Sequence, residues 1–114
     1  TTFPSGGAEG DEAATDPGDL AVTTVRTLVD EGLVACGQVL PGVIRSFFHW
    51  DGEVQDETEV LVLLKTTEAR WKEVQDRLRE LHPYEVPEIV ACPASESQAY
   101  GAWLHRRCGA VGGP

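Results

Sequence analysis

Hydrophobic and polar positions in the first part of the chain follow a helical period. From residue 20 onwards, large apolar side chains recur three and four positions apart, which places them along one face of a helix. Asp19 is suited to cap the N-terminus of this helix, and Gly32 is suited to end it. The positions predicted to face the core are Val22, Val25, Leu28, Val29 and Leu33.

The pattern then changes to one typical of β-strands. Residues 33–50 are rich in branched and aromatic side chains, and Pro41-Gly42 interrupts them once. Because proline cannot donate a backbone hydrogen bond to a neighbouring strand, we predict a long strand with a bulge or bend at that point. Asp51-Gly52 follows, and this dipeptide is the strongest short-range signal for a hairpin turn. We expect the return strand at residues 59–66.

A second helix, a short strand and a terminal helix complete the pattern. Residues 68–81 carry apolar side chains on one helical face, and Pro83 ends that helix because the residue before a proline is pushed away from helical angles. Residues 88–93 predict a fourth strand, and residues 98–107 predict a short terminal helix. We expect residues 108–114 to be a disordered tail.

Residues 5–19 differ in composition from the rest of the chain. They combine several glycines and carboxylates with no basic residue and no large apolar side chain. A segment of this kind cannot anchor itself in a core, so we predict a flexible acidic loop. It lacks the glycine and closing glutamate of the EF-hand calcium loop.

The order of the predicted elements indicates the fold class. Strand, helix, strand, strand, helix and strand form the split βαβ arrangement of the ferredoxin-like fold. We therefore predict one α+β domain over residues 1–107, a ferredoxin-like βαββαβ sandwich with a short C-terminal helix. Only Thr1, Thr2 and Phe3 stand where a first strand of about five or six residues is usual. We interpret the sequence as starting inside that strand.

The apolar run at residues 60–64 predicts an oligomer. A strand whose side chains are continuously apolar is buried on both faces. The two substantial helices can cover one face of the sheet, and the chain is too short to supply a second sheet for the other. We therefore expect another subunit to cover that face.

Composition and charge narrow the class of partner. The net charge is −10, from 19 acidic and 9 basic residues, and this balance repels phosphate backbones and anionic lipid surfaces. No apolar run approaches the roughly 18 residues of a membrane span. The three cysteines have neither zinc-finger spacing nor the pattern of a disulfide scaffold, and free thiols suit a reducing compartment. They are Cys36, Cys92 and Cys108. We expect a cytoplasmic protein that binds neither nucleic acid nor membranes.

Four motifs then resemble those of one family. The motifs are LVDEGLVAC at 28–36, WDGE at 50–53 followed by EVLVLLKT at 59–66, LHPYEVPEI at 81–89, and Tyr100-x-x-Trp103. On their order and spacing the chain is identified as a member of the CutA family of divalent-cation tolerance proteins. The resemblance implies a PII-like homotrimer linked to tolerance of copper and other divalent metals, without an established catalytic activity. Three features depart from the family pattern: Gly37-Gln38 after Cys36, the acidic stretch at 5–19, and the short first strand, of which only Thr1, Thr2 and Phe3 stand in the sequence.

Cys36 and His82 are the candidate metal ligands. Cys36 lies in a family motif, and a thiolate binds soft ions such as Cu(I) well, although a free cysteine often acts as a small buried hydrophobe. His82 lies at a helix end, where an imidazole suits copper or zinc but also satisfies exposed carbonyls. Cys92 is predicted to lie in the core and Cys108 in the tail. The expected cofactor is copper or another divalent cation.

A second group of residue types suits a pocket between subunits. Lysine, glutamate and aromatic side chains together can hold a small anionic ligand, and they can equally serve as interface anchors. We find no nucleophile–base set and no P-loop, HExxH or GxSxG motif, so we predict a non-enzymatic protein. The alternative to metal binding is a PII-like signalling or scaffold trimer. The pocket residues are Trp50, Glu59, Lys65, Tyr84, Glu88 and Trp103.

Overall fold

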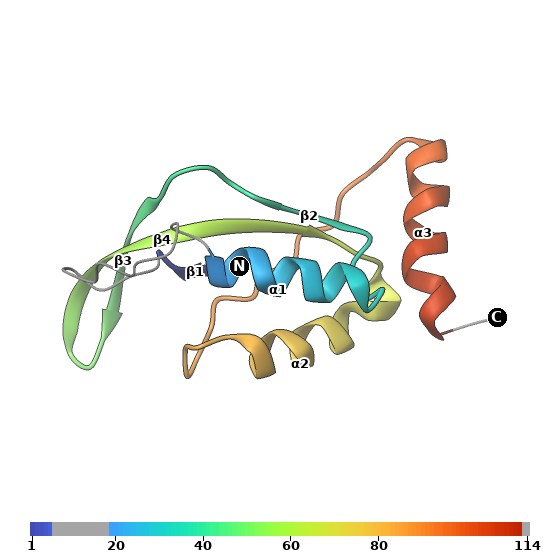
Figure 1. The fold of residues 1–114 in the computed structure, drawn as a ribbon. Helices are drawn as coiled ribbons and strands as arrows, with labels where there is room; N and C mark the ends of the chain where they lie inside the picture. The colour runs from blue at the N-terminus through green and yellow to red at the C-terminus, as the bar shows by residue number, and fades with distance from the viewer. Residues whose placement is uncertain (6–18, 113–114) are drawn as a thin grey trace.

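The computed structural model of the chain describes residues 1–5 and 19–112. The predicted acidic loop falls largely on residues 6–18, outside the described residues, and so does the end of the predicted tail at 113–114. In chain order the elements are β1 (Thr2–Pro4), α1 (Asp19–Asp30), β2 (Cys36–Val39), β3 (Ile44–Trp50), β4 (Glu53–Lys65), the 3₁₀ helix η1 (Glu68–Arg70), α2 (Trp71–Leu81) and α3 (Gln98–Gly112), as Figure 1 shows.

The strand β4 forms the centre of an antiparallel sheet. β1 pairs with one edge of β4, with Thr2 opposite Leu61. β2 and β3 share the other edge, where they pair with residues 62–65 and 53–59 of β4. They are the two halves of the long predicted strand, so the bend expected at Pro41-Gly42 is confirmed. This order of strands is that of the predicted α+β, ferredoxin-like fold.

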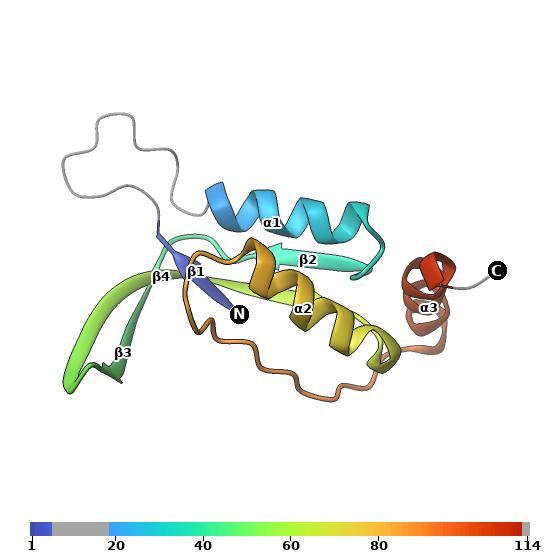
Figure 2. The same ribbon diagram turned by 90° about the horizontal axis from the view of Figure 1, so that it is seen from below.

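Both α1 and α2 cover the same face of the sheet, as the two views in Figures 1 and 2 show. Their apolar stripes meet β4 in one core, and Arg77 of α2 ties the helices together through a 2.7 Å ion pair with Glu31. The left-handed Gly32, with φ of 73°, follows the end of α1 and confirms the predicted stop. The buried core is formed by Phe3, Ala21, Val25, Leu28, Leu33, Val34, Val60, Val62, Val74 and Leu78.

Side chains of β4 alternate between a covered and an uncovered face. Val60 and Val62 are each 1% exposed beneath the helices. Leu63 points to the opposite face of the sheet and is 48% exposed. Residues 60–64, predicted to be buried on both faces of the sheet, are therefore covered on one face only within a single chain. The other face has no cover among the residues that the structure describes.

The hairpin forms at the predicted dipeptide but is longer than expected. Asp51 and Gly52 both have positive φ, 53° and 79°, which suits a two-residue turn with the twist of the flanking strands. The return strand begins at Glu53 instead of residue 59. Residues 53–58 are mostly polar, so their own pattern does not mark a strand, and pairing with β3 imposes it.

The predicted strand at 88–93 is wrong for the single chain. These residues lie in an irregular segment between α2 and α3 and pair with no described strand (Figure 2). In a ferredoxin-like sheet a fourth strand lies beside the first, and β1 offers only three residues for pairing. Cys92 is accordingly exposed and not in the core.

The terminal helix is longer than predicted and well anchored. α3 continues to Gly112, through residues 108–112 that the sequence assigns to the tail. Cys108 is fully buried and packs with Ala35 and Leu104 in a second small core. Arg70 donates a 2.9 Å hydrogen bond from Nε to the Cys108 carbonyl. Non-local contacts of this kind, absent from the local pattern, fix the end of the helix.

Candidate functional site

Cys36 lies where β2 begins, at the end of the sheet nearest α3. It pairs with Lys65, the last residue of β4. Its Sγ atom lies 3.0 Å from the hydroxyl of Tyr100 on α3, and this hydrogen bond raises the pKa of the tyrosine. The thiol is partly exposed, so it is accessible to a soft metal ion.

Two polar side chains complete the surroundings of the thiol. Gln38 lies two residues further along β2, with Nε2 4.0 Å from the Cys36 sulfur, and Lys65 donates a hydrogen bond to its Oε1. Trp103 packs beside Tyr100 with a ring-centroid distance of 5.5 Å. The fold thus brings Cys36, Lys65 and Trp103 together at one end of the sheet. The sequence analysis named Gln38 only as a departure from the family pattern and Tyr100 only as a motif residue, and it gave neither a role at the site.

His82 lies in a different part of the molecule, against β1. Its Nε2 donates to the Thr2 carbonyl at 2.6 Å, and its Nδ1 accepts from the backbone N–H of Tyr84 at 3.1 Å. The ring is 7% exposed and stacks on Phe3, and burial lowers the pKa of His82. Both nitrogens have partners within the chain, so a metal ion would have to displace one of these bonds.

Glu59, which is buried, and Tyr84, which is half-buried, form a polar pair next to this histidine. The Tyr84 hydroxyl donates to Oε2 of Glu59 at 2.8 Å, and Thr2 donates to the same oxygen at 3.3 Å. Burial, followed by the hydrogen bond with the carboxylate, raises the pKa of Tyr84. Glu88 is exposed, and its charge acts on the Thr1 amino group, whose pKa burial nevertheless lowers.

The predicted site residues therefore lie in three separate places within one chain. Cys36 stands opposite Lys65 on β4, whereas Thr2, the partner of His82, stands opposite Leu61. Four residues of strand separate these positions by about 13 Å. Glu59 and Tyr84 lie on the His82 side, Lys65 and Trp103 lie on the Cys36 side, and Trp50 lies at the end of β3 beside the hairpin turn. Within residues 1–5 and 19–112, no three His, Cys, Asp or Glu side chains are grouped to hold a metal.

Many large apolar side chains are exposed in the single chain. Large hydrophobic side chains of the hairpin, of β4 and of the segment after α2 are between about a third and two-thirds exposed. Apolar area of this extent on a small chain marks an interaction surface. The residues concerned are Val43, Ile44, Phe47, Phe48, Trp50, Val54, Leu63, Val86 and Val90.

Known proteins share both the sequence and the fold of this chain. The family described as CutA1 divalent ion tolerance protein matches residues 14–107. The divalent-cation tolerance protein CutA of Thermus thermophilus is 41% identical over 92 residues, 80% of this chain and 88% of that protein. CutA1 from Pyrococcus horikoshii superposes with a TM-score of 0.74 at 33% identity, over 94% of this chain and 92% of that one. A PII-like protein CutA from a Nostoc species gives 0.73 at 28% identity, over 95% and 92%.

Proposed function

Because the chain belongs to the CutA1 divalent ion tolerance family, we propose that it is a homotrimeric metal-tolerance protein that binds copper or another divalent cation. Cys36 carries this proposal, since its thiol is partly exposed and lies beside the Tyr100 hydroxyl at one end of the sheet. A thiolate is the protein ligand that soft copper prefers. His82 is a weaker candidate than the sequence indicates, because both of its nitrogens already have partners.

The exposed apolar side chains support the assembly part of this proposal. Leu63 and the aromatic residues Phe47 and Phe48 are exposed in the isolated chain, and a second copy of the chain would remove them from water. Association would also allow donors from a neighbouring subunit to complete the ligand set of Cys36. The protein binds and responds without catalysis, and its free cysteines suit the cytoplasm.

A competition titration with Cu(I) on reduced protein tests the metal site. We expect Cys36→Ser to weaken binding at least tenfold. The matched control is Cys92→Ser, which removes an exposed thiol that takes no part in the Cys36–Tyr100 contact and should leave affinity unchanged. His82→Gln separates the two candidate ligands, since we expect it to retain binding. Equal affinity in wild type and Cys36→Ser would contradict the proposed site.

Mass measurement in solution tests the assembly. Light scattering should give three times the chain mass at micromolar concentration, and the melting temperature should rise with protein concentration because association stabilises the folded chain by mass action. Leu63→Glu places a charge on the uncovered face and should lower the mass. A monomeric wild type would overturn the trimer, whatever the metal titration gives.

A second candidate function is a PII-like signalling or scaffold trimer. Lys65, Trp103 and Tyr100 share one end of the sheet, where a cation beside two aromatic rings could hold a small anion or a partner peptide at the cleft between subunits. Glu59, Tyr84, Glu88 and Trp50 would join the pocket from other subunits. A thermal-shift screen of small metabolite anions should then give a shift that Lys65→Gln abolishes. Absence of any shift would favour metal binding alone.

A further inference from the structure

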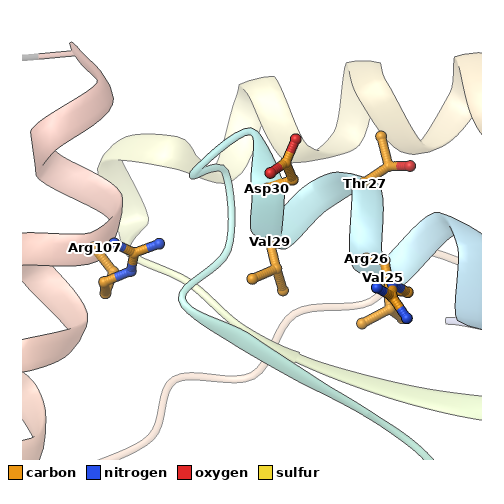
Figure 3. A pocket seen from close by; sticks show the side chains of 6 residues that line it. All are labelled: Val25, Arg26, Thr27, Val29, Asp30 and Arg107. Atoms are coloured by element: carbon orange, nitrogen blue, oxygen red, sulfur yellow. The ribbon is translucent and has the colours of Figure 1, made fainter.

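An open groove lies between α1 and the second half of α3, away from the Cys36 group. Its volume is about 580 Å³, and Figure 3 shows Arg107 extending from α3 towards the side chains of α1. None of the candidate residues of the metal site or the predicted pocket lines it. The lining residues are Val25, Arg26, Thr27, Val29, Asp30 and Arg107.

The groove holds two arginines without a carboxylate partner. Neither Arg26 nor Arg107 forms an ion pair with any residue in the described ranges, although acidic residues outnumber basic ones by 19 to 9. Glu31, which directly follows α1, is engaged by Arg77 of α2 at 2.7 Å. Two exposed guanidinium groups facing one groove create a local positive field in an acidic protein.

The remaining lining distinguishes this groove from a simple cationic surface. Val25 is 8% exposed and Val29 is half-buried, so the floor is aliphatic. The Thr27 hydroxyl donates its hydrogen to the Thr23 carbonyl at 2.9 Å, so it has no hydrogen left to donate to a ligand. In Figure 3, the Asp30 side chain points up from α1, whereas the Val29 side chain points down, on the same side as Val25 and Arg26. Recognition would therefore combine two cationic groups with a short apolar contact.

We propose that this groove binds a small aliphatic dicarboxylate. Arginine matches a carboxylate with two parallel N–H donors, and one such pair at each end would leave the hydrocarbon chain over the two valines. Inorganic phosphate has no part that the aliphatic floor could contact, and a fatty acid would leave one guanidinium without an anion. Asp30 also lines the groove, and its negative charge weakens the binding of any anion.

Adipate titrated into isotopically labelled full-length protein tests this assignment, with backbone amide shifts of α1 and α3 as the readout. We expect saturable shifts at residues 25–30 and around Arg107. Arg26→Gln and Arg107→Gln should each weaken binding at least tenfold, and Asp30→Asn should strengthen it severalfold. Raising the salt concentration should weaken adipate binding, since the groove is open to solvent.

Two comparisons make the result decisive. Hexanoate, with one carboxylate on the same carbon chain, should bind at least tenfold more weakly than adipate. The control variant Arg79→Gln removes an exposed arginine of α2 outside the groove and should leave the adipate affinity unchanged. Shifts that survive both groove substitutions, or the absence of saturable shifts in the wild type, would overturn the proposal. Because Cys36 and Lys65 are untouched, these outcomes are independent of the Cu(I) titration.

Discussion

His82 donates a 2.6 Å hydrogen bond from Nε2 to the backbone carbonyl of Thr2, and this bond ties the turn after α2 to β1. The other ring nitrogen accepts from the Tyr84 N–H, so the proton of the neutral ring must reside on Nε2. The two residues are 80 positions apart in the chain. A histidine that resembles a metal ligand in the sequence therefore acts as a structural link between two elements.

Acid should destabilise the fold through this histidine. Burial depresses the pKa of His82 in the folded state below its ordinary value of 6.5, so the unfolded chain binds the proton first. The stability present above pH 6.5 should fall as the pH drops below that value, and the loss should be complete below the folded pKa. Protonation of Nδ1 would also break the hydrogen bond from the Tyr84 N–H, because both groups would then be donors.

Urea unfolding at pH 7.5, 6.0 and 5.0 measures this effect. His82→Gln keeps an amide donor but cannot titrate, so its stability should fall less between pH 7.5 and pH 5.0 than that of the wild type. Parallel losses in the two proteins would assign the acid sensitivity to carboxylates instead.

Tyr84→Phe should destabilise the chain by about 1–2 kcal/mol. The substitution removes the hydroxyl that donates to Glu59, a carboxylate only 5% exposed, and hydrogen bonds to charged groups are among the stronger ones. Tyr100→Phe is the matched control, because its hydroxyl meets the Cys36 thiol at an exposed position. The urea midpoint should move for the first variant only, and equal midpoints would show that the Glu59 bond contributes nothing.

Gly37→Ala should destabilise the contact between α1 and β2. A Cβ at this position would lie 2.7 Å from Cγ1 of Val25 and 2.9 Å from Cδ2 of Leu64. Leu64 can turn away, but a β-branched valine on a helix is held in one rotamer, so we expect a loss of about 1–3 kcal/mol.

A double-mutant cycle checks the origin of that loss. Val25→Ala removes the methyl groups that would clash with the new Cβ. This substitution should therefore lower the free energy of unfolding less in the Gly37→Ala variant than in the wild type. Additive losses would mean that Val25 does not limit the space at residue 37.

Gly52→Ala should weaken the hairpin by about 1–2 kcal/mol, because residue 52 has φ of 79°, where an L side chain clashes with its own backbone. Gly109→Ala tests the opposite sign. This glycine lies in α3 with open space around its Cβ position, so alanine should stabilise the chain by about 0.5–1 kcal/mol. Thermal melts of the two variants should shift in opposite directions, and a common direction would contradict the assignment.

The amino-acid sequence by itself determined the features that depend on local conformation. The apolar period of three and four residues placed α1 and α2, Pro41-Gly42 placed the bend between β2 and β3, and Asp51-Gly52 placed the hairpin turn. These signals act within a few residues, because they restrict the backbone angles of the residues that carry them. The fold class followed from their order along the chain.

Tertiary structure alone decided which side chains meet. Pairing with β3 makes a strand of the polar residues 53–58, whereas residues 88–93 stay irregular beside a β1 of only three residues. Cys36 meets Tyr100 across 64 residues, whereas His82 is directed away from Cys36 and against β1. Contacts of this range depend on how the packed elements fill space, and no local period of the sequence encodes them.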